Sequence, residues 1–172
     1  MDSVEDECRV TARLRLRPLR RADAAFIALY AGDRRVAWMT ASIPHPYPPG
    51  SAEAFVDSTL RTRAQVWAMD HRGSSEGELV GLITLRETGE IGYWVGAPFW
   101  STGFATEAVD AVVKTGLAMG HKRLSARVFQ DNPASARVLT KAGFAYLGEG
   151  TVFSVARNAV VPDWRYQRDG AR

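Results

Sequence analysis

The sequence contains a single cysteine and no long apolar run, and both absences narrow its class. Cys8 alone cannot form an intrachain disulfide, which is typical of proteins from a reducing compartment. The first eight residues are largely acidic and lack the apolar stretch of a signal peptide, and nothing approaches the length of a membrane-spanning helix. We therefore expect a cytoplasmic protein without a membrane partner.

Metal-binding residues are also sparse. The three histidines, His45, His71 and His121, lie far apart in the sequence and have no cysteine companions. Because a protein metal site needs several ligands brought together, no metal site is expected.

What the sequence does contain is typical of a folded single domain. Hydrophobic residues make up 46% and charged residues 24% of the 172 residues, enough for one substantial core. We expect residues 1–172 to form one domain, with residues 1–10 as a flexible tail. The net charge is +3, a mild basic excess that suits a phosphate-bearing ligand or nucleic acid but identifies neither.

A cluster of arginines near the N-terminus is the one feature that suggests nucleic-acid binding. Residues 12–17 alternate between apolar and arginine side chains, which predicts a strand with one apolar and one cationic face. The arginines of the cluster are Arg13, Arg15, Arg17, Arg20 and Arg21. No aromatic stacking residues, helix-turn-helix or zinc ligands accompany them. We favour a solvated strand face, with a basic nucleic-acid-binding module as the less favoured alternative.

The spacing of the apolar residues predicts an α/β domain. Helices are expected at 21–31, 51–63 and 104–119, with Ser51 capping the second of them, and a fourth is expected to begin with Asp131 or Asn132 as its cap and to end at Gly143. Strands are expected at 12–17, 65–70, 79–86, 90–95, 123–129, 144–147 and 163–168. Short, glycine-containing connections between the middle strands indicate antiparallel hairpins, so the sheet is predicted to be mainly antiparallel.

The segment 90–108 has the pattern of a ligand-binding turn. A strand leads through Gly96 and Gly103 into a helix, whose first turn offers unpaired N–H groups and the positive end of the helix dipole. Such a turn could hold a pyrophosphate. The glycine spacing fits neither a Walker motif nor a dinucleotide fingerprint, and taken alone the pattern is more often a plain helix start.

Neighbouring residues make the pattern more specific. Residues 90–95 (Glu-Ile-Gly-Tyr-Trp-Val), 99–100 (Phe-Trp) and 103–108 (Gly-Phe-Ala-Thr-Glu-Ala) together resemble the coenzyme A segment of the GNAT acetyltransferases. Residues 132–135 (Asn-Pro-Ala-Ser) and 141–144 (Lys-Ala-Gly-Phe) resemble the last conserved helix of that superfamily, in the branch of the ribosomal-protein alanine N-acetyltransferases (RimJ/RimL-type). The resemblance implies the GNAT fold, a mixed, mainly antiparallel central sheet of about six to seven strands with about four helices on both faces.

The same resemblance implies acetyl-CoA as the co-substrate and direct attack of an amine on its thioester. Backbone amides at the end of the strand would hold the pantetheine arm, and the turn would face the pyrophosphate. The residues that the resemblance places at the cofactor are Trp94, Val95, Ser101, Thr102, Gly103, Phe104, Ala105, Thr106, Asn132 and Ser135.

Two residues are expected to move protons. Glu90 occupies the strand position where many family members carry a catalytic glutamate, and it could accept the amine proton through water. Leu139 stands at the position of the family's usual tyrosine acid and cannot donate a proton, so Ser135 is the candidate acid. For both residues a structural role stays open, as a solvated strand-end carboxylate and as a first-turn helix hydroxyl.

One departure from the family pattern raises a second possibility. Ser101 and Thr102 stand where the branch has glycine followed by arginine or lysine, so a cation near the phosphates is missing. A cation could instead come from Lys122, Arg123 or Arg137. Without one, the chain could be a non-catalytic acyl-CoA-binding sensor of the same fold.

The acceptor is the part of the reaction that the sequence determines least. Its pocket is expected to involve Trp38, Tyr47, Trp67 and Tyr93. A larger fraction of α-amines than of lysine amines is neutral at pH 7, which favours a protein N-terminal α-amine or a small amine or amino acid. The absence of acidic residues from 36–50 disfavours a polyamine. Both a monomer and a homodimer are compatible with the sequence.

Overall fold

The computed structural model describes residues 8–74 and 78–170. The first seven residues of the expected flexible tail 1–10 lie outside this range. Arg9–Val10 form a short strand, β1, which pairs with residues 15 and 16, so the end of that segment is part of the fold. No helix in the described ranges is long and apolar enough to cross a membrane.

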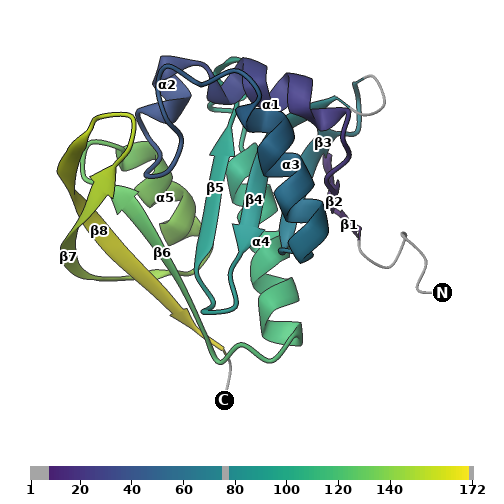
Figure 1. Cartoon of the computed structure of the whole chain (residues 1–172). Coiled ribbons are helices and arrows are strands. Elements are labelled where there is room, and N and C mark those ends of the chain that lie inside the picture. Colours follow the sequence, from purple (N-terminus) through teal and green to yellow (C-terminus); the bar gives the residue numbers. More distant parts are fainter. Residues whose placement is uncertain (1–7, 75–77, 171–172) are drawn as a thin grey trace.

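Within the described residues, eight strands form two sheets (Figure 1). The larger sheet is antiparallel and has the order β1-β2-β3-β4-β5. Its strands after β1 are β2 Leu14–Pro18, β3 Val66–His71, β4 Leu79–Leu85 and β5 Ile91–Val95. The smaller antiparallel sheet has the order β6-β8-β7. Its strands are β6 Arg123–Phe129, β7 Ala145–Ser154 and β8 Ala159–Asp169.

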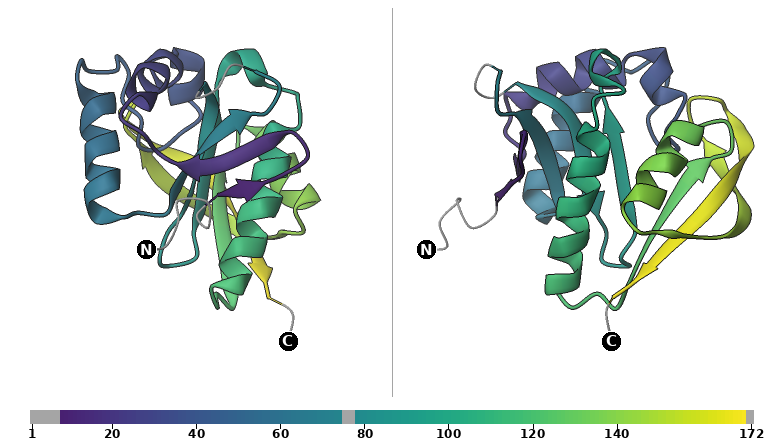
Figure 2. Two further views of the ribbon diagram at one scale, coloured as in Figure 1. Left: turned by 90° about the vertical axis from the view of Figure 1, so that its right-hand side faces the viewer. Right: turned by 180° about the vertical axis from the view of Figure 1, so that it is seen from behind.

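Helices cover both faces of the larger sheet (Figures 1 and 2). The helices are α1 Asp23–Ala31, α2 Arg34–Ala37, α3 Ser51–Thr62, α4 Phe104–Ala118 and α5 Pro133–Lys141. Helices α1 and α3 enclose one apolar core against one face, and α4 and α5 enclose a second core against the other. Strand β4 contributes to both cores: Leu79 and Leu82 pack under α1 and α3, whereas Val80 and Ile83 pack under α4. The predicted α/β class and mainly antiparallel sheet are confirmed.

The two sheets meet at one point and then separate. A single parallel bridge joins Glu90 to Ser125, and the N–H of Ser125 donates to the carbonyl of Gly89 at 3.0 Å. Beyond this bridge β5 and β6 diverge towards their C-terminal ends (Figure 1). The predicted mixed, mainly antiparallel sheet is thus present as five and three described strands on either side of this gap, joined by the parallel bridge.

Three local predictions differ from the structure. The strands expected at 144–147 and 163–168 are parts of a long hairpin of β7 and β8, whose glycines at 148 and 150 obscure the strand pattern. Helix α2 is only four residues long, too short for a periodic signal. Ser51 is the first residue of α3 rather than its cap, because Gly50 takes the cap position with a φ of 80°.

The cationic strand face expected at 12–17 is not uniformly solvated. The Arg17 side chain is 1% exposed, and its Nη1 and Nη2 donate to the two carboxylate oxygens of Asp23 at 2.9 and 2.8 Å. Its Nε donates to Oδ2 of Asp70 at 2.6 Å. Burial alone would lower the pKa of Arg17, but these two carboxylates raise it, so the guanidinium stays charged. The arginine cluster therefore does not present one continuous face to nucleic acid.

Replacing Arg17 by methionine should destabilise the protein strongly, because it leaves the buried carboxylate of Asp23 without its bidentate partner. We expect a loss of about 3–5 kcal/mol in the free energy of unfolding, measured by urea denaturation. Arg35→Met, which removes an exposed ion pair to Asp33, is the control and should change little. Equal denaturation midpoints for the two variants would contradict this role for Arg17.

Candidate functional site

The edge of β5 at the gap presents main-chain groups. The N–H of Arg86 donates to the carbonyl of Glu90 at 2.9 Å, and the N–H of Gly96 donates to the carbonyl of Val80 at 2.8 Å. Because hydrogen-bonded pairs alternate along an antiparallel ladder, the even-numbered residues between them also bond to β4. The N–H and C=O groups of Tyr93 and the N–H of Val95 therefore point into the gap, whereas the carbonyl of Val95 accepts from Nε1 of Trp100 at 2.7 Å.

A tight turn follows β5 and leads into α4. A short 3-10 helix, Ala97–Phe99, is followed by Ser101 and Gly103, which have φ values of 60° and 84°. The Thr102 hydroxyl donates to the carbonyl of Phe99 at 2.6 Å and closes the turn. A left-handed conformation costs a serine roughly 1 kcal/mol, so this turn is held in place by its surroundings.

The N-terminus of α4 has no side-chain cap. The side chain of Asn132 caps α5 and that of Asp33 caps α2, whereas Gly103, at the corresponding position of α4, has no side chain. The first N–H groups of a helix have no partner within the helix. Together with the dipole of a 15-residue helix, they form a place where an anion is stabilised.

Arg13, which directly precedes β2, reaches this turn. Its Nη1 donates to the carbonyl of Thr102 at 2.8 Å, and its Nε pairs with Glu107 at 3.0 Å. The guanidinium also lies over the ring of Phe104, 4.9 Å from its centre. Sequence reasoning assigned Arg13 to a solvated strand face, and the alternation pattern carried no signal for this long-range contact.

Two of the cations that the sequence offered as substitutes lie elsewhere. Lys122 and Arg123 follow the C-terminal end of α4, about 22 Å along the helix axis from the turn at its N-terminus. Arg123 pairs there with Asp169 at 3.0 Å. Arg137 lies on α5 and is exposed. Arg13 is thus the arginine that the structure brings into contact with the turn.

The remaining predicted cofactor residues fall on both sides of the gap. Ser101, Thr102 and Gly103 are exposed, Ala105 and Thr106 are partly exposed, and the Phe104 side chain is buried. Val95 is in the core under α4, and Trp94 packs towards α1 and α3. Asn132 and Ser135 face them from α5.

Tyr93 and Ser135 connect the two sides of the gap. The phenolic oxygen of Tyr93 lies 2.7 Å from the hydroxyl oxygen of Ser135. The cap of α5 is made by Asn132, whose Oδ1 accepts the N–H of Ser135 at 3.3 Å, so the Ser135 hydroxyl is not needed there. Burial raises the pKa of Tyr93 to about 12, although the hydrogen bond with Ser135 opposes this. Both hydroxyls therefore keep their protons at neutral pH.

Glu90 lies on the opposite face of β5 from Tyr93. Its two carboxylate oxygens face two arginines: Nη1 of Arg86 is 3.8 Å from Oε1, and Nη2 of Arg127 is 3.4 Å from Oε2. The Glu90 side chain is 27% exposed. It is thus partly accessible and paired, rather than a free strand-end carboxylate.

A cleft of about 1300 Å³ runs along the face of β4 and β5 between α3 and β6. Glu90, Tyr93, Trp94 and Tyr47 are among its lining residues, so the structure brings the candidate base together with two of the expected acceptor residues.

The other two expected acceptor residues lie elsewhere. Trp67 is 5% exposed and packs in the core, because its side chain points to the α4 side of β3. Trp38 ends α2, with its ring between Arg34 and Arg157 and its carbonyl accepting from Arg157.

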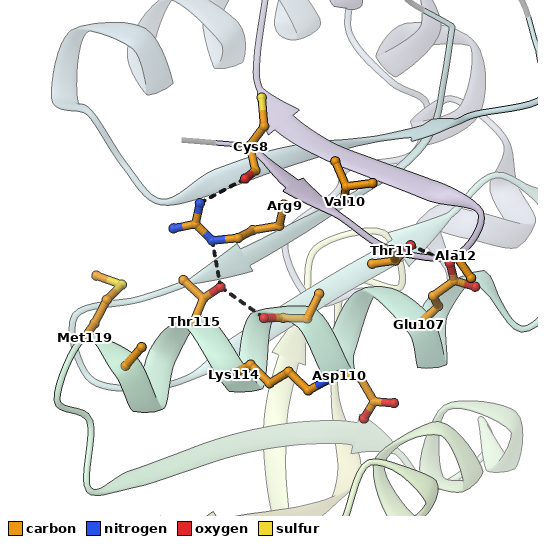
Figure 3. A pocket seen from close by; sticks show the side chains of 12 residues that line it. Cys8, Arg9, Val10, Thr11, Ala12, Glu107, Asp110, Lys114, Thr115 and Met119 are labelled. Carbon is orange, nitrogen blue, oxygen red and sulfur yellow. Dashed lines mark hydrogen bonds between the residues drawn. The ribbon is translucent and has the colours of Figure 1, made fainter. Parts of the chain in front are cut away.

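A second hollow, of about 670 Å³, lies between β1 and the outer side of α4 (Figure 3). In it, Nε of Arg9 donates to the Thr115 hydroxyl at 3.2 Å, and Cys8 lies at its rim (Figure 3). Neither Tyr93 nor Ser135 is among its lining residues, so it is separate from the gap between the sheets.

This combination of a split sheet, an uncapped helix start and a following capped helix agrees with the sequence resemblance. The family described as acetyltransferase (GNAT) domain matches residues 13–145, which include the gap, the turn and α5. The chain belongs to the GNAT acetyltransferase family.

The chain is similar to one curated relative over about half of its length and to solved structures over most of its length. The Bacillus subtilis (strain 168) protein YoaA, an uncharacterized N-acetyltransferase, is 39% identical over 85 residues, or 45% of this chain and 47% of YoaA. This match therefore spans about half of that relative. A GNAT-family acetyltransferase from Bacillus anthracis has a TM-score of 0.81 at 24% identity, covering 94% of this chain and 98% of its own. RimL, the ribosomal L7/L12 alpha-N-protein acetyltransferase solved with coenzyme A, has a TM-score of 0.77 at 16% identity, covering 94% and 96%.

The raised pKa of Tyr93 predicts a loss of stability at alkaline pH. A folded-state pKa of about 12 against roughly 10 in the unfolded chain favours the fold below pH 10, and this contribution fades as pH rises towards 12. We expect the free energy of unfolding to fall by about 1 kcal/mol more in the wild type than in Tyr93→Phe between about pH 9 and pH 11. Denaturant titrations at the two pH values measure this, and parallel losses in both proteins would show that Tyr93 is not shielded.

Proposed function

We propose that the protein is an acetyl-CoA-dependent N-acetyltransferase that transfers the acetyl group directly to a primary amine. The observation that carries the proposal is the gap between β5 and β6. Its β5 edge presents the N–H and C=O of Tyr93 and the N–H of Val95, and it continues into the uncapped start of α4. An extended ligand arm with amide groups can pair with such an edge as an added strand would.

Successive residues along the gap would bind successive parts of acetyl-CoA, from the pantetheine arm to the pyrophosphate. The main chain at Tyr93 and Val95 would bind the pantetheine arm, and the turn from Ser101 to Thr106 would bind the pyrophosphate through N–H groups and hydroxyls. Asn132 would contact the arm from α5. Acetyl-CoA supplies an activated acetyl group as a thioester, and fixed main-chain donors beside its carbonyl would stabilise the charge that develops on oxygen.

The two proton transfers, from the amine and to the leaving thiolate, would take place on opposite faces of β5. Glu90, in the cleft, would accept the proton of the amine through water. Ser135, hydrogen-bonded to Tyr93, would donate a proton to the departing thiolate, and Tyr93 can pass its own proton to Ser135 across their 2.7 Å contact. Tyr93 thus supplies the phenol that the family's usual position, Leu139, lacks.

The acceptor class follows from the family and the cleft together. RimL acts on a ribosomal protein α-amine, and this chain shares its fold and the motifs of the RimJ/RimL-type branch. An N-terminal α-amine or a small amine of the cytoplasm is the acceptor that we propose. A non-catalytic acyl-CoA sensor is the second candidate, because Thr102 lacks the branch's cation and Arg13 is already paired with Glu107.

Binding of acetyl-CoA should depend on Gly103. Gly103→Ala places a Cβ in a left-handed turn, 3.1 Å from Nη2 of Arg13, so the turn must move to relieve the strain. We expect acetyl-CoA affinity, measured by calorimetry, to fall about tenfold, the equivalent of roughly 1.4 kcal/mol. Gly50→Ala is a matched control, since Gly50 caps α3 with a φ of 80° and has open space around it. No binding to the wild type at millimolar acetyl-CoA would refute the proposed function.

Turnover should depend on Ser135. Ser135→Ala is expected to lower kcat by about 10²- to 10⁴-fold if the hydroxyl acts as the general acid, with acetyl-CoA binding retained. Coenzyme A release with a panel of amines measures this. The sensor alternative predicts binding without release for every amine, in the wild type as in the variant.

A further inference from the structure

The charges of the cleft are gathered at one of its ends. The end beside the loop 39–47 and the start of α3 is lined by neutral side chains, including Met39, Ile43, Tyr47 and Phe55. The other end lies at the hairpin between β4 and β5. Its ionisable residues are Arg63, Arg86, Glu87, Glu90, His121 and Arg127. Three arginines stand against two glutamates there, which leaves this end with an excess of positive charge.

The guanidinium groups at this end have many unused donors. Each arginine has five N–H donors. Arg127 makes one contact within hydrogen-bonding distance, to Glu90 at 3.4 Å, and Arg86 lies 3.8 Å from the same carboxylate. Arg63 has no carboxylate within 4 Å in the described parts of the chain. The Arg127 and Arg86 side chains are 44% and 68% exposed, so they remain accessible to a ligand.

Arg157 shows by contrast what an arginine with a structural role looks like in this protein. It binds both carboxylate oxygens of Asp131 at 2.7 and 3.1 Å and the carbonyl of Trp38 at 2.7 and 2.9 Å. Its side chain is only 11% exposed. Arg127 and Arg86 instead share the carboxylate of Glu90, so most of their N–H donors remain available to a ligand in the cleft.

We propose that the amine acceptor is a small amino carboxylate whose anionic group binds Arg127 and Arg86 at this end of the cleft. This inference rests on the proposed acetyl transfer and names its substrate class. Glu90, just before β5, and Tyr93 are three residues apart, about 10 Å along the strand, so the amine proton would reach Glu90 through more than one water. An acceptor that bridges the arginines and the acetyl group must therefore separate its amine from its carboxylate by a chain longer than that of an α-amino acid.

The test compares amines with and without the anionic group. A series of ω-amino carboxylates of increasing chain length is assayed beside ω-amino alcohols of the same length, and kcat/KM is measured by coenzyme A release. We expect the wild type to prefer the longer carboxylates over the matched alcohols by roughly ten- to a hundredfold, as is typical of hydrogen bonds to a charged group. A dipeptide and its C-terminal amide form a further pair, which shows whether a peptide carboxylate is accepted as well.

Arginine variants test which residues cause the preference for carboxylates. Arg127→Gln should reduce the preference for carboxylates over matched alcohols to near unity, with acetyl-CoA binding retained; the ratio of the two kcat/KM values is the readout because Arg127 also pairs with Glu90. Arg86→Gln, on the exposed hairpin, should reduce it partly and serves where Arg127→Gln is poorly folded. Arg123→Gln is the matched control, because Arg123 lies on the same strand and pairs with Asp169 outside the cleft.

The outcomes separate this inference from the proposed function. Equal kcat/KM for carboxylates and alcohols in the wild type would overturn the substrate class and leave acetyl transfer standing. A carboxylate preference that survives both Arg127→Gln and Arg86→Gln would overturn the assignment to this cluster. Absence of transfer to every amine, with acetyl-CoA bound, would overturn the proposed function and this inference with it.

Discussion

The functional geometry depends on the separation of β5 from β6 after one bridge. An unpaired strand edge is costly when it is buried, since each main-chain N–H and C=O needs a partner. Here α4 follows β5 and α5 follows β6, and both helices pack on one core to which both sheets contribute. The two sheets thus share a core although their strands separate, and the edge of β5 stays available for a ligand that can satisfy it.

The turn after β5 offers main-chain groups at a position where the family pattern has a side-chain cation. The resemblance to the family placed arginine or lysine where Thr102 stands, and Arg13 now contacts the carbonyl of that residue. Because Arg13 is also paired with Glu107, its net contribution to an anion is small, and its contacts hold the turn instead. Anion binding at this position then relies on main-chain N–H groups and the helix dipole, which depend on geometry more than on charge. The left-handed backbone conformation of Ser101 is strained, and this strain is the energetic cost of the turn geometry.

Patterns over a few neighbouring residues predicted the helices and most strands well. They could not predict contacts between residues far apart in the sequence. The periodicity of residues 104–119 and the cap at Asn132 located α4 and α5 within one or two residues. The burial of Arg17 was not predictable, because alternation shows which residues share a face but not that Asp70, 53 residues away, meets them there. Likewise the contact between Tyr93 and Ser135 joins two motifs that the sequence identified separately. The full length of the β7–β8 hairpin was not predicted. Its glycines have a low strand propensity, and the pairing within the three-stranded sheet keeps them extended.

The alternation of side chains along β5 explains why the two candidate proton-transfer groups do not compete. Even-numbered residues, Glu90 and Trp94 among them, face the cleft and the α1–α3 side, whereas Tyr93 points to α5. An amine entering by the cleft and an acyl donor lying along α4 and α5 would therefore meet only at the gap. The proton taken from the amine and the proton given to the leaving thiolate then travel on opposite sides of one strand. Burial keeps the Tyr93 phenol protonated at neutral pH although this residue also lines the cleft, so the strand itself would set the donor side apart from Glu90, and the charged hairpin end would remain free to select the acceptor.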